Sequence, residues 1–224
     1  MKKYLILDMG RVLVEPTTGD WLITPTFLDN IDSKRIDKVN LIEAKEKCRY
    51  LLDGKAETLE EEYKIVEKFF KEVFKLLEYN IPKENFENIV RDFVYNENDN
   101  KYYLYDDVKE ELKRLAKKYT LLMLSDNWPC GEEYLKKHEI HKYFTKVYIS
   151  SVYASRKCDK VFFDYLINDF NIKKGEALFV DDIEELLDIG VEKGLDVMLM
   201  DRNNLVKNSK YTIINSLKEL EYFR

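Results

Sequence analysis

The chain has 224 residues, 45% of them hydrophobic, and a formal net charge of −6 at pH 7. A chain of this length and hydrophobic content can bury a sizeable core, which excludes an intrinsically disordered protein. Its 37 basic and 43 acidic residues give no general attraction for nucleic acid or anionic lipid, so outside a local basic pocket we expect small molecules as partners.

The cysteines and the N-terminus indicate the compartment. Cys48, Cys130 and Cys158 are odd in number, far apart and without CxxC spacing. This pattern favours reduced thiols over a disulfide framework or a zinc site, and therefore an intracellular protein. The apolar run after "MKK" is only "YLIL" before Asp8 follows, far too short for a signal-peptide core or a membrane span. We expect a cytoplasmic protein.

Short apolar runs typical of buried strands recur along the chain, at residues 4–7, 119–125, 146–150, 177–180 and 196–200. Helical stretches separate the last four runs. Because these runs are apolar throughout rather than alternating, both faces of the sheet are expected to be covered. The pattern predicts an α/β fold with a doubly wound parallel sheet.

A long helical segment separates the first two of these strands. Ser33 is expected to start one helix, Thr58 and Glu61 in "TLEE" form a capping box for a second, and Pro82 stands where a third begins. The sequence therefore predicts a core made of residues 1–15 and 101–224, with a helical insert over residues 16–100.

The residues that directly follow the apolar runs are the candidates for chemistry, because ligands of an open parallel sheet bind at the carboxyl ends of its strands. Asp8 follows the first run, and Ser125 and Asp126 follow the second. The pair Asp181 and Asp182 follows the run at 177–180. We expect these side chains to converge.

Three converging carboxylates repel one another, and their pKa values rise unless a cation lies among them. Carboxylate oxygens from separate chain segments suit Mg²⁺, which keeps room for waters and a substrate phosphate. Lys157, which precedes a helix, and the hydroxyl of Ser125 would complete an anion site beside the metal. The set predicts phosphoryl transfer.

The order of these motifs resembles the haloacid dehalogenase-like (HAD) hydrolase superfamily. The motifs are "YLILDMG", a strand ending in Ser125, a lone Lys157 before a helix, and "ALFVDD", and they extend over nearly the whole chain. The resemblance implies a HAD-like core with a helical cap inserted after the first strand, here residues 16–100. It also implies a Mg²⁺-dependent phosphatase that acts on a small phosphorylated metabolite such as a sugar phosphate.

The resemblance also implies the role of each residue. Asp8 would be the nucleophile that becomes a transient aspartyl phosphate, and would also bind the metal. The other metal contacts would be the Gly10 carbonyl and Asp182, with Asp181 acting on the metal through water or through the residues that bind it. The transferring phosphoryl group would be held by Ser125, Asp126 and Lys157. Arg11 follows Gly10, and we expect its guanidinium to reach a substrate anion at the pocket mouth.

Gly10 departs from the family pattern, because phosphatases of the superfamily usually carry an Asp there as general acid and base. Such a group typically contributes about 10²- to 10⁴-fold, so slower chemistry is expected. Two alternatives stay open. One is a phosphonate-cleaving enzyme that forms a Schiff base on a lysine of the insert, among them Lys34, Lys38, Lys45, Lys47 and Lys55. The other is a regulatory protein that binds a phosphorylated metabolite with little turnover. Dehalogenases fit the Asp181 and Asp182 pair less well.

A structural interpretation of the acidic residues competes with the catalytic one. Aspartate is common in turns and at helix N-termini, and Asp8, Asp181 and Asp182 all follow predicted strands. The ordered set of four motifs favours the catalytic interpretation.

Overall fold

The computed structural model describes residues 2–222, which form two compact units. Within that range, the core unit contains the chain up to Glu15, the segment Leu104–Asn127 and the chain from Gly131 onward. The helical unit contains Pro16–Tyr103 and Trp128–Cys130. No helix in the described range is long and apolar enough to cross a membrane.

The core unit contains a six-stranded sheet with strand order β5-β4-β1-β6-β7-β8, and the pairings between neighbouring strands are parallel. Five of the six strands coincide with the five predicted apolar runs, and this parallel sheet confirms the predicted α/β class. The sheet consists of β1 (Tyr4–Leu7), β4 (Thr120–Ser125), β5 (Lys146–Ile149), β6 (Ala177–Asp181), β7 (Asp196–Met200) and β8 (Ile213–Ile214).

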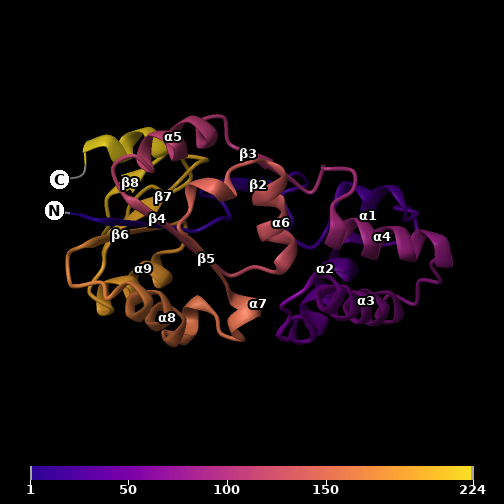
Figure 1. The fold of residues 1–224 in the computed structure, drawn as a ribbon. Coiled ribbons are helices and arrows are strands. Elements are labelled where there is room, and N and C mark those ends of the chain that lie inside the picture. Colours follow the sequence, from indigo (N-terminus) through magenta and orange to yellow (C-terminus); the bar gives the residue numbers. More distant parts are fainter. Residues whose placement is uncertain (1, 223–224) are drawn as a thin grey trace. The chain divides into compact units, whose positions relative to one another are not determined.

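Helices cover both faces of this sheet, which is why its strands are apolar on both sides. Figure 1 shows α8 (Val161–Phe170) and α9 (Glu184–Glu192) along one face and α5 (Val108–Leu115) along the other. On the first face, Phe162, Phe163 and Leu187 join one buried cluster with Ile6 and Phe179 of the strands. The shorter helical elements of the core are η2 (His141–Tyr143), α7 (Ser150–Tyr153), η3 (Lys157–Asp159) and η4 (Leu217–Tyr222). The helix α6 (Pro129–Lys137) begins with two residues that belong to the helical unit and continues in the core unit from Gly131.

The helical unit is built from α1 (Pro25–Asp29), α2 (Lys38–Cys48), η1 (Arg49–Leu52), α3 (Leu59–Leu76) and α4 (Lys83–Tyr95). The predicted capping box of Thr58 and Glu61 is present at the start of α3, and Pro82 precedes α4. The prediction for Ser33 is wrong, because α2 begins only at Lys38, where the Asp37 carboxylate accepts backbone N–H groups of the first turn.

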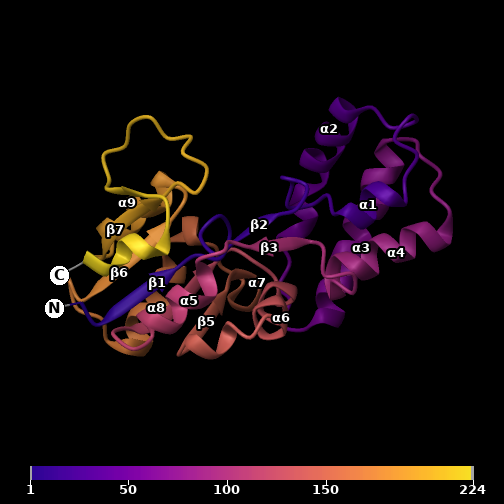
Figure 2. The ribbon, with the colours of Figure 1, turned by 90° about the horizontal axis from the view of Figure 1, so that it is seen from above.

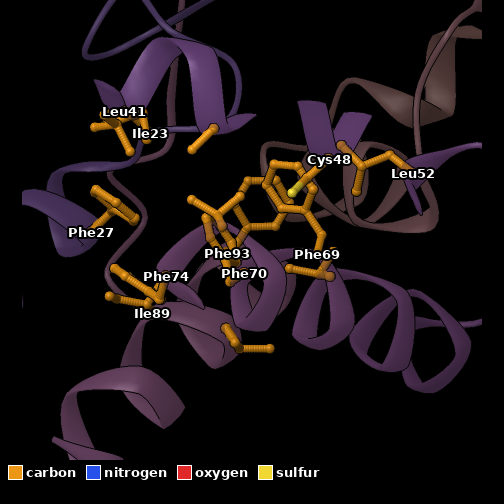
Figure 3. Close-up of a cluster of buried hydrophobic side chains, with 14 of the residues drawn as sticks. Ile23, Phe27, Leu41, Cys48, Leu52, Phe69, Phe70, Phe74, Ile89 and Phe93 are labelled. Atoms are coloured by element: carbon orange, nitrogen blue, oxygen red, sulfur yellow. The ribbon is translucent and has the colours of Figure 1, made fainter. Parts of the chain in front are cut away.

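Aromatic side chains fill the core of the helical unit. Figure 3 shows Phe27, Phe70, Phe74 and Phe93 pointing toward one another from α1, α3 and α4. The Phe27 and Phe74 rings stack with centroids 5.7 Å apart, and Phe70 meets Phe93 edge-on at 5.6 Å. Such pairs add to the stabilisation that burial of the rings already gives. This unit therefore has a hydrophobic core of its own.

Three residues far along the chain also belong to the helical unit. Trp128 packs against its hydrophobic core. The Cys130 N–H donates to the Glu62 carboxylate at 2.8 Å, and the Lys101 ammonium donates to Cys130 Sγ at 3.3 Å. These contacts are buried, so the segment Trp128–Cys130 is fixed in the interior of the helical unit.

Two chain passages lead between the units. They form a separate two-stranded sheet of β2 (Val14–Pro16) and β3 (Tyr102–Leu104). The sequence places the end of the insert at residue 100, whereas the helical unit continues to Tyr103.

Candidate active site

The candidate site lies at the carboxyl ends of three neighbouring strands of the core unit, β4, β1 and β6. Leu7 pairs with Met123 on one side and with Val180 on the other, so the three strands end at nearly the same level. Asp8 directly follows β1, while Ser125 and Asp181 are the last residues of β4 and β6. Parallel pairing thus places Asp8 at the same edge of the sheet as two polar residues that are more than one hundred positions further along the chain.

An acidic cluster is the main feature of this edge. Asp8, Asp181 and Asp182 each offer a carboxylate oxygen within 4.8 Å of the others. Asp8 is 6% exposed and Asp181 is completely buried. Asp8 Oδ1 is buried, and its contact with a cation in the described part of the chain is an ion pair that lacks hydrogen-bond geometry. Three buried or half-buried carboxylates that share one ammonium are hard oxygen ligands that fit a divalent cation such as Mg²⁺.

Lys157 lies within this cluster with only 2% of its surface exposed. Its ammonium is 2.6 Å from Asp181 Oδ2 and 3.0 Å from Asp8 Oδ1. Burial alone would lower the pKa of Lys157, but the neighbouring carboxylates, Asp181 first, outweigh it and raise the pKa above its ordinary value. Lys157 therefore stays charged and fixes the nucleophile candidate Asp8 against the end of β6.

Asp126 holds the loop that carries this lysine. Its Oδ1 accepts the backbone N–H of Lys157 at 3.0 Å. The structure thus shows Asp126 positioning Lys157, and its predicted contact with a phosphoryl group stays a prediction. Ser125 is 2% exposed at the end of β4. Next along the chain, the Asn127 N–H donates to Ser150 Oγ at 3.1 Å, which ties the loop after β4 to the end of β5.

The two carboxylates at the end of β6, those of Asp181 and Asp182, have raised pKa values. Burial is the main cause for Asp181, and the nearby Asp8 charge adds to it, while Lys157 opposes both. Burial, followed by the Asp8 charge, raises the pKa of Asp182 to about 6. The single charge of Lys157 therefore does not compensate the three carboxylates, and a further cation would be stabilised here.

Asp181 also has the structural role that competes with the catalytic interpretation. Its Oδ1 accepts the Ile183 N–H at 3.0 Å, just before α9 begins. Its Oδ2 accepts the bond from Lys157 at 2.6 Å. The same carboxylate thus orients the turn into α9 and faces the acidic cluster.

Arg11 lies beside the acidic cluster in a left-handed backbone conformation, with φ of 50°. Its Nη1 is 3.6 Å from Asp182 Oδ2, and its Nε is 3.5 Å from Glu15 Oε1. The side chain is 45% exposed. The guanidinium therefore bridges two acidic groups of the protein, and its contact with a substrate anion stays a prediction. Gly10 forms an isolated bridge with Val14 in the same turn.

The structure also reveals a buried ion pair that the sequence motifs do not include. Arg202 Nη1 lies 2.8 Å from Asp107 Oδ1, and both side chains are less than a tenth exposed. Arg202 also donates to the Val12 carbonyl, in the turn that follows Asp8. It is the second residue after β7, at the same edge of the sheet as Asp8. Reading the residues after every strand end would have identified it.

The sequence matches the family model of the haloacid dehalogenase-like hydrolases over residues 34–217. A relative of known activity is the D-ribitol-5-phosphate phosphatase of Bacteroides thetaiotaomicron, which is 28% identical over 109 residues. The match covers 46% of this chain and 53% of the relative, so the aligned stretch spans about half the length of that enzyme.

Several solved structures share the fold of this chain over almost its entire length. The HAD-hydrolase YfnB from Bacillus subtilis, solved with magnesium, has a TM-score of 0.69 at 16% identity, covering 98% of this chain and 96% of that one. The L-2-haloacid dehalogenase from Xanthobacter autotrophicus has a TM-score of 0.67 at 12% identity, covering 98% and 97%. These likenesses establish the fold, which does not by itself determine the reaction.

Proposed function

Because the chain belongs to the haloacid dehalogenase-like hydrolase family, we propose that it is a Mg²⁺-dependent phosphatase of small phosphorylated metabolites. The observation that carries the proposal is the buried cluster of Asp8, Asp181 and Asp182 with Lys157 in contact with two of them. Three carboxylates and one ammonium suit a metal-bound phosphoryl group, which needs cations around its oxygens. The helical unit is proposed as the cap that selects the substrate.

In this proposal Asp8 acts as the nucleophile. One of its carboxylate oxygens attacks phosphorus, the bond from phosphorus to the leaving oxygen breaks, and the leaving oxygen carries away the electron pair. Water then attacks the aspartyl phosphate and releases inorganic phosphate. Lys157 and Ser125 would stabilise charge on the phosphoryl oxygens. The residues proposed to hold Mg²⁺ are Asp8, Asp182, Asp181 and the carbonyl of Gly10, and the bound ion would neutralise phosphoryl charge.

Gly10 affects the kind of ester that this site can cleave. A glycine side chain cannot protonate the leaving oxygen, so the reaction must depend on a leaving group that accommodates negative charge. We therefore expect aryl phosphates to be cleaved faster than alkyl phosphates. Among metabolites, polyol and sugar phosphates are the first class to test, because the relative with 28% identity is a ribitol phosphate phosphatase.

The proposed function is tested with a panel of phosphate esters that includes p-nitrophenyl phosphate, ribitol 5-phosphate and several sugar phosphates. The expected result is phosphate release that requires Mg²⁺ and stops when EDTA removes it. A chain that releases no phosphate from any ester, but binds one of them by calorimetry only when Mg²⁺ is present, would instead be a binding or regulatory protein.

Metal binding itself is testable through stability. Because the folded-state pKa of Asp182 is raised to about 6, the folded metal-free protein binds a proton that the unfolded chain releases. This carboxyl group therefore favours folding more as the pH falls from about 7 to about 4. Mg²⁺ needs the deprotonated form, so it should raise the melting temperature more at about pH 7.5 than at about pH 5. An equal rise at both pH values would contradict the assignment.

A second candidate, phosphonate cleavage, is favoured by one observation in the helical unit. Of the lysines considered above, Lys45 is buried, at 5% exposure, and pairs with Asp20, whereas Lys34, Lys38, Lys47 and Lys55 are exposed. Burial is a feature of lysines that form Schiff bases, and the ion pair of Lys45 with Asp20 would first have to open to release the neutral amine. Borohydride treatment in the presence of a phosphonoaldehyde would then leave a reduced adduct on Lys45, which the phosphatase proposal does not predict.

A further inference from the structure

We infer that Arg202 is a positioning residue for the reaction, because from the carboxyl end of β7 it fixes the turn that follows Asp8. The inference rests on the proposed function, since it concerns the geometry of that site. Arg202 follows β7 and opens the long loop between β7 and β8, drawn in gold in Figure 2. Its side-chain partners lie in three separate segments of the core unit, at Val12, at Tyr105 and Asp107, and at Asn215.

The guanidinium of Arg202 is held from one side by Asp107. Arg202 Nη1 donates to both Asp107 oxygens, at 2.8 and 2.9 Å. Asp107 Oδ2 also accepts the Ser216 hydroxyl at 2.6 Å and the Leu217 N–H at 2.8 Å. The carboxylate thus joins the start of α5, the loop after β7 and the C-terminal segment. Arg202 has little freedom to move.

The other side of the guanidinium forms hydrogen bonds with the turn after Asp8. Arg202 Nε and Nη2 both donate to the Val12 carbonyl, at 3.1 and 2.6 Å. Val12 is completely buried, so its carbonyl would lose hydrogen bonding if the guanidinium were removed. The turn is otherwise closed by short backbone bonds, from Arg11 to Val14 at 2.7 Å and from Leu13 to Met9 at 2.9 Å. Its conformation sets the direction of the Gly10 carbonyl.

A chain of side-chain contacts also connects Arg202 with the acidic cluster. Its guanidinium lies over the Tyr105 ring, 4.4 Å from the centroid. The Tyr105 hydroxyl donates to Glu15 Oε2, and Glu15 Oε1 is 3.5 Å from Arg11 Nε. Arg11 in turn reaches Asp182 at 3.6 Å. Arg202 is therefore connected with the site in two ways, through the turn that carries the Gly10 carbonyl and through the side-chain contacts that end at Asp182.

Arginine suits this place because of the shape of its side chain. Its planar fork donates in two directions at once, toward Val12 and toward Asp107, and its face stacks on Tyr105. Lysine carries the same charge on a single nitrogen and cannot span both acceptors. Arg202→Lys therefore keeps the buried charge and removes the double contact.

Two measurements on the full-length Arg202→Lys variant test the inference. Hydrogen exchange should become faster at the amides of Arg11, Leu13 and Val14, while the amides of β1 stay as protected as in the wild type. With p-nitrophenyl phosphate and Mg²⁺, kcat should fall by about tenfold to 10²-fold while KM changes less than about threefold, since misplacement of about 1 Å can cost this much.

The matched control is Arg114→Lys, which alters another arginine of the core unit, paired with Glu111 on α5 at 2.5 Å. This control should leave both kcat and the hydrogen exchange of the turn amides unchanged. If hydrogen exchange at the turn amides of Arg202→Lys is the same as in the wild type, the inference is overturned, whether or not the enzyme is active. A loss of activity that appears only as a higher KM would also overturn it. A wild-type chain that hydrolyses no ester would instead refute the proposed function, and the exchange result would still decide whether Arg202 holds the turn.

Discussion

Replacing Asp8 by Asn is expected to reduce phosphate release by at least about 10³-fold, because an amide oxygen cannot serve as the nucleophile. The change keeps the shape of the side chain. It also removes one charge from a cluster whose oxygens lie within 4.8 Å of one another, so the variant should fold, with a melting temperature no lower than that of the wild type without Mg²⁺. Initial rates with p-nitrophenyl phosphate, together with thermal denaturation, measure both effects.

The control for this variant is Asp188→Asn, a carboxylate that pairs with Lys210 and is 41% exposed. It removes the same charge away from the site and should retain full activity. If the Asp8→Asn protein kept more than a small fraction of the wild-type rate, the nucleophile would have to be another group.

Replacing Lys157 by Met is expected to lower kcat by about 10²- to 10³-fold, the usual cost of removing a group that stabilises transition-state charge. Stability should fall as well. Asp8 and Asp181 would lose the ammonium at 3.0 and 2.6 Å, and leaving a buried charge unpaired costs about 3–5 kcal/mol. The free energy of unfolding in urea and the rate with p-nitrophenyl phosphate test the two effects separately.

The pH dependence of the Lys157→Met variant distinguishes this explanation from simple loss of packing. Burial already raises the pKa of Asp181 in the folded protein, and without the ammonium this pKa should rise further above that in the unfolded chain. The folded state then binds protons that the unfolded state releases, so the free energy of unfolding should increase as the pH falls from about 7 to about 5. Added Mg²⁺ should restore part of the stability at neutral pH.

The control is Lys160→Met, three residues along the chain, whose ammonium is 54% exposed and pairs with Glu192. It should change stability by less than about 1 kcal/mol. Equal losses for Lys157 and Lys160, with the same pH dependence as the wild type, would contradict the role given to Lys157.

The sequence predicts the sheet well because its strands are buried on both faces and therefore apolar throughout. All five apolar runs form strands, and these five strands are consecutive in the sheet. The sixth strand, Ile213–Ile214, is only two residues long and follows a polar loop, so it has no comparable pattern. Ser33 shows the limit of local capping signals: several cap-forming residues occur between 32 and 37, and Asp37 rather than Ser33 starts the helix.

The position of the candidate site can be predicted from the sequence, because the carboxyl ends of neighbouring parallel strands lie at the same edge of the sheet. This rule located Asp8, Ser125 and the Asp181 pair, and the structure brings the acidic members within 4.8 Å. Contacts that depend on tertiary packing could not be predicted in this way. The bond from Arg202 to Val12 joins residues 190 positions apart and belongs to no motif. The contact between Cys130 and Glu62, which are 68 positions apart, also belongs to no motif.

Trapping the phosphorylated enzyme tests the central claim most directly. Wild-type protein turning over p-nitrophenyl phosphate with Mg²⁺ is quenched with sodium borohydride, which reduces an acyl phosphate of aspartate to homoserine. The tryptic peptide "YLILDMGR", residues 4–11, is then examined by mass spectrometry. We predict homoserine in place of Asp8 only when substrate and Mg²⁺ are both present. Sustained phosphate release with this peptide unmodified, and the reduced residue found elsewhere, would contradict the account.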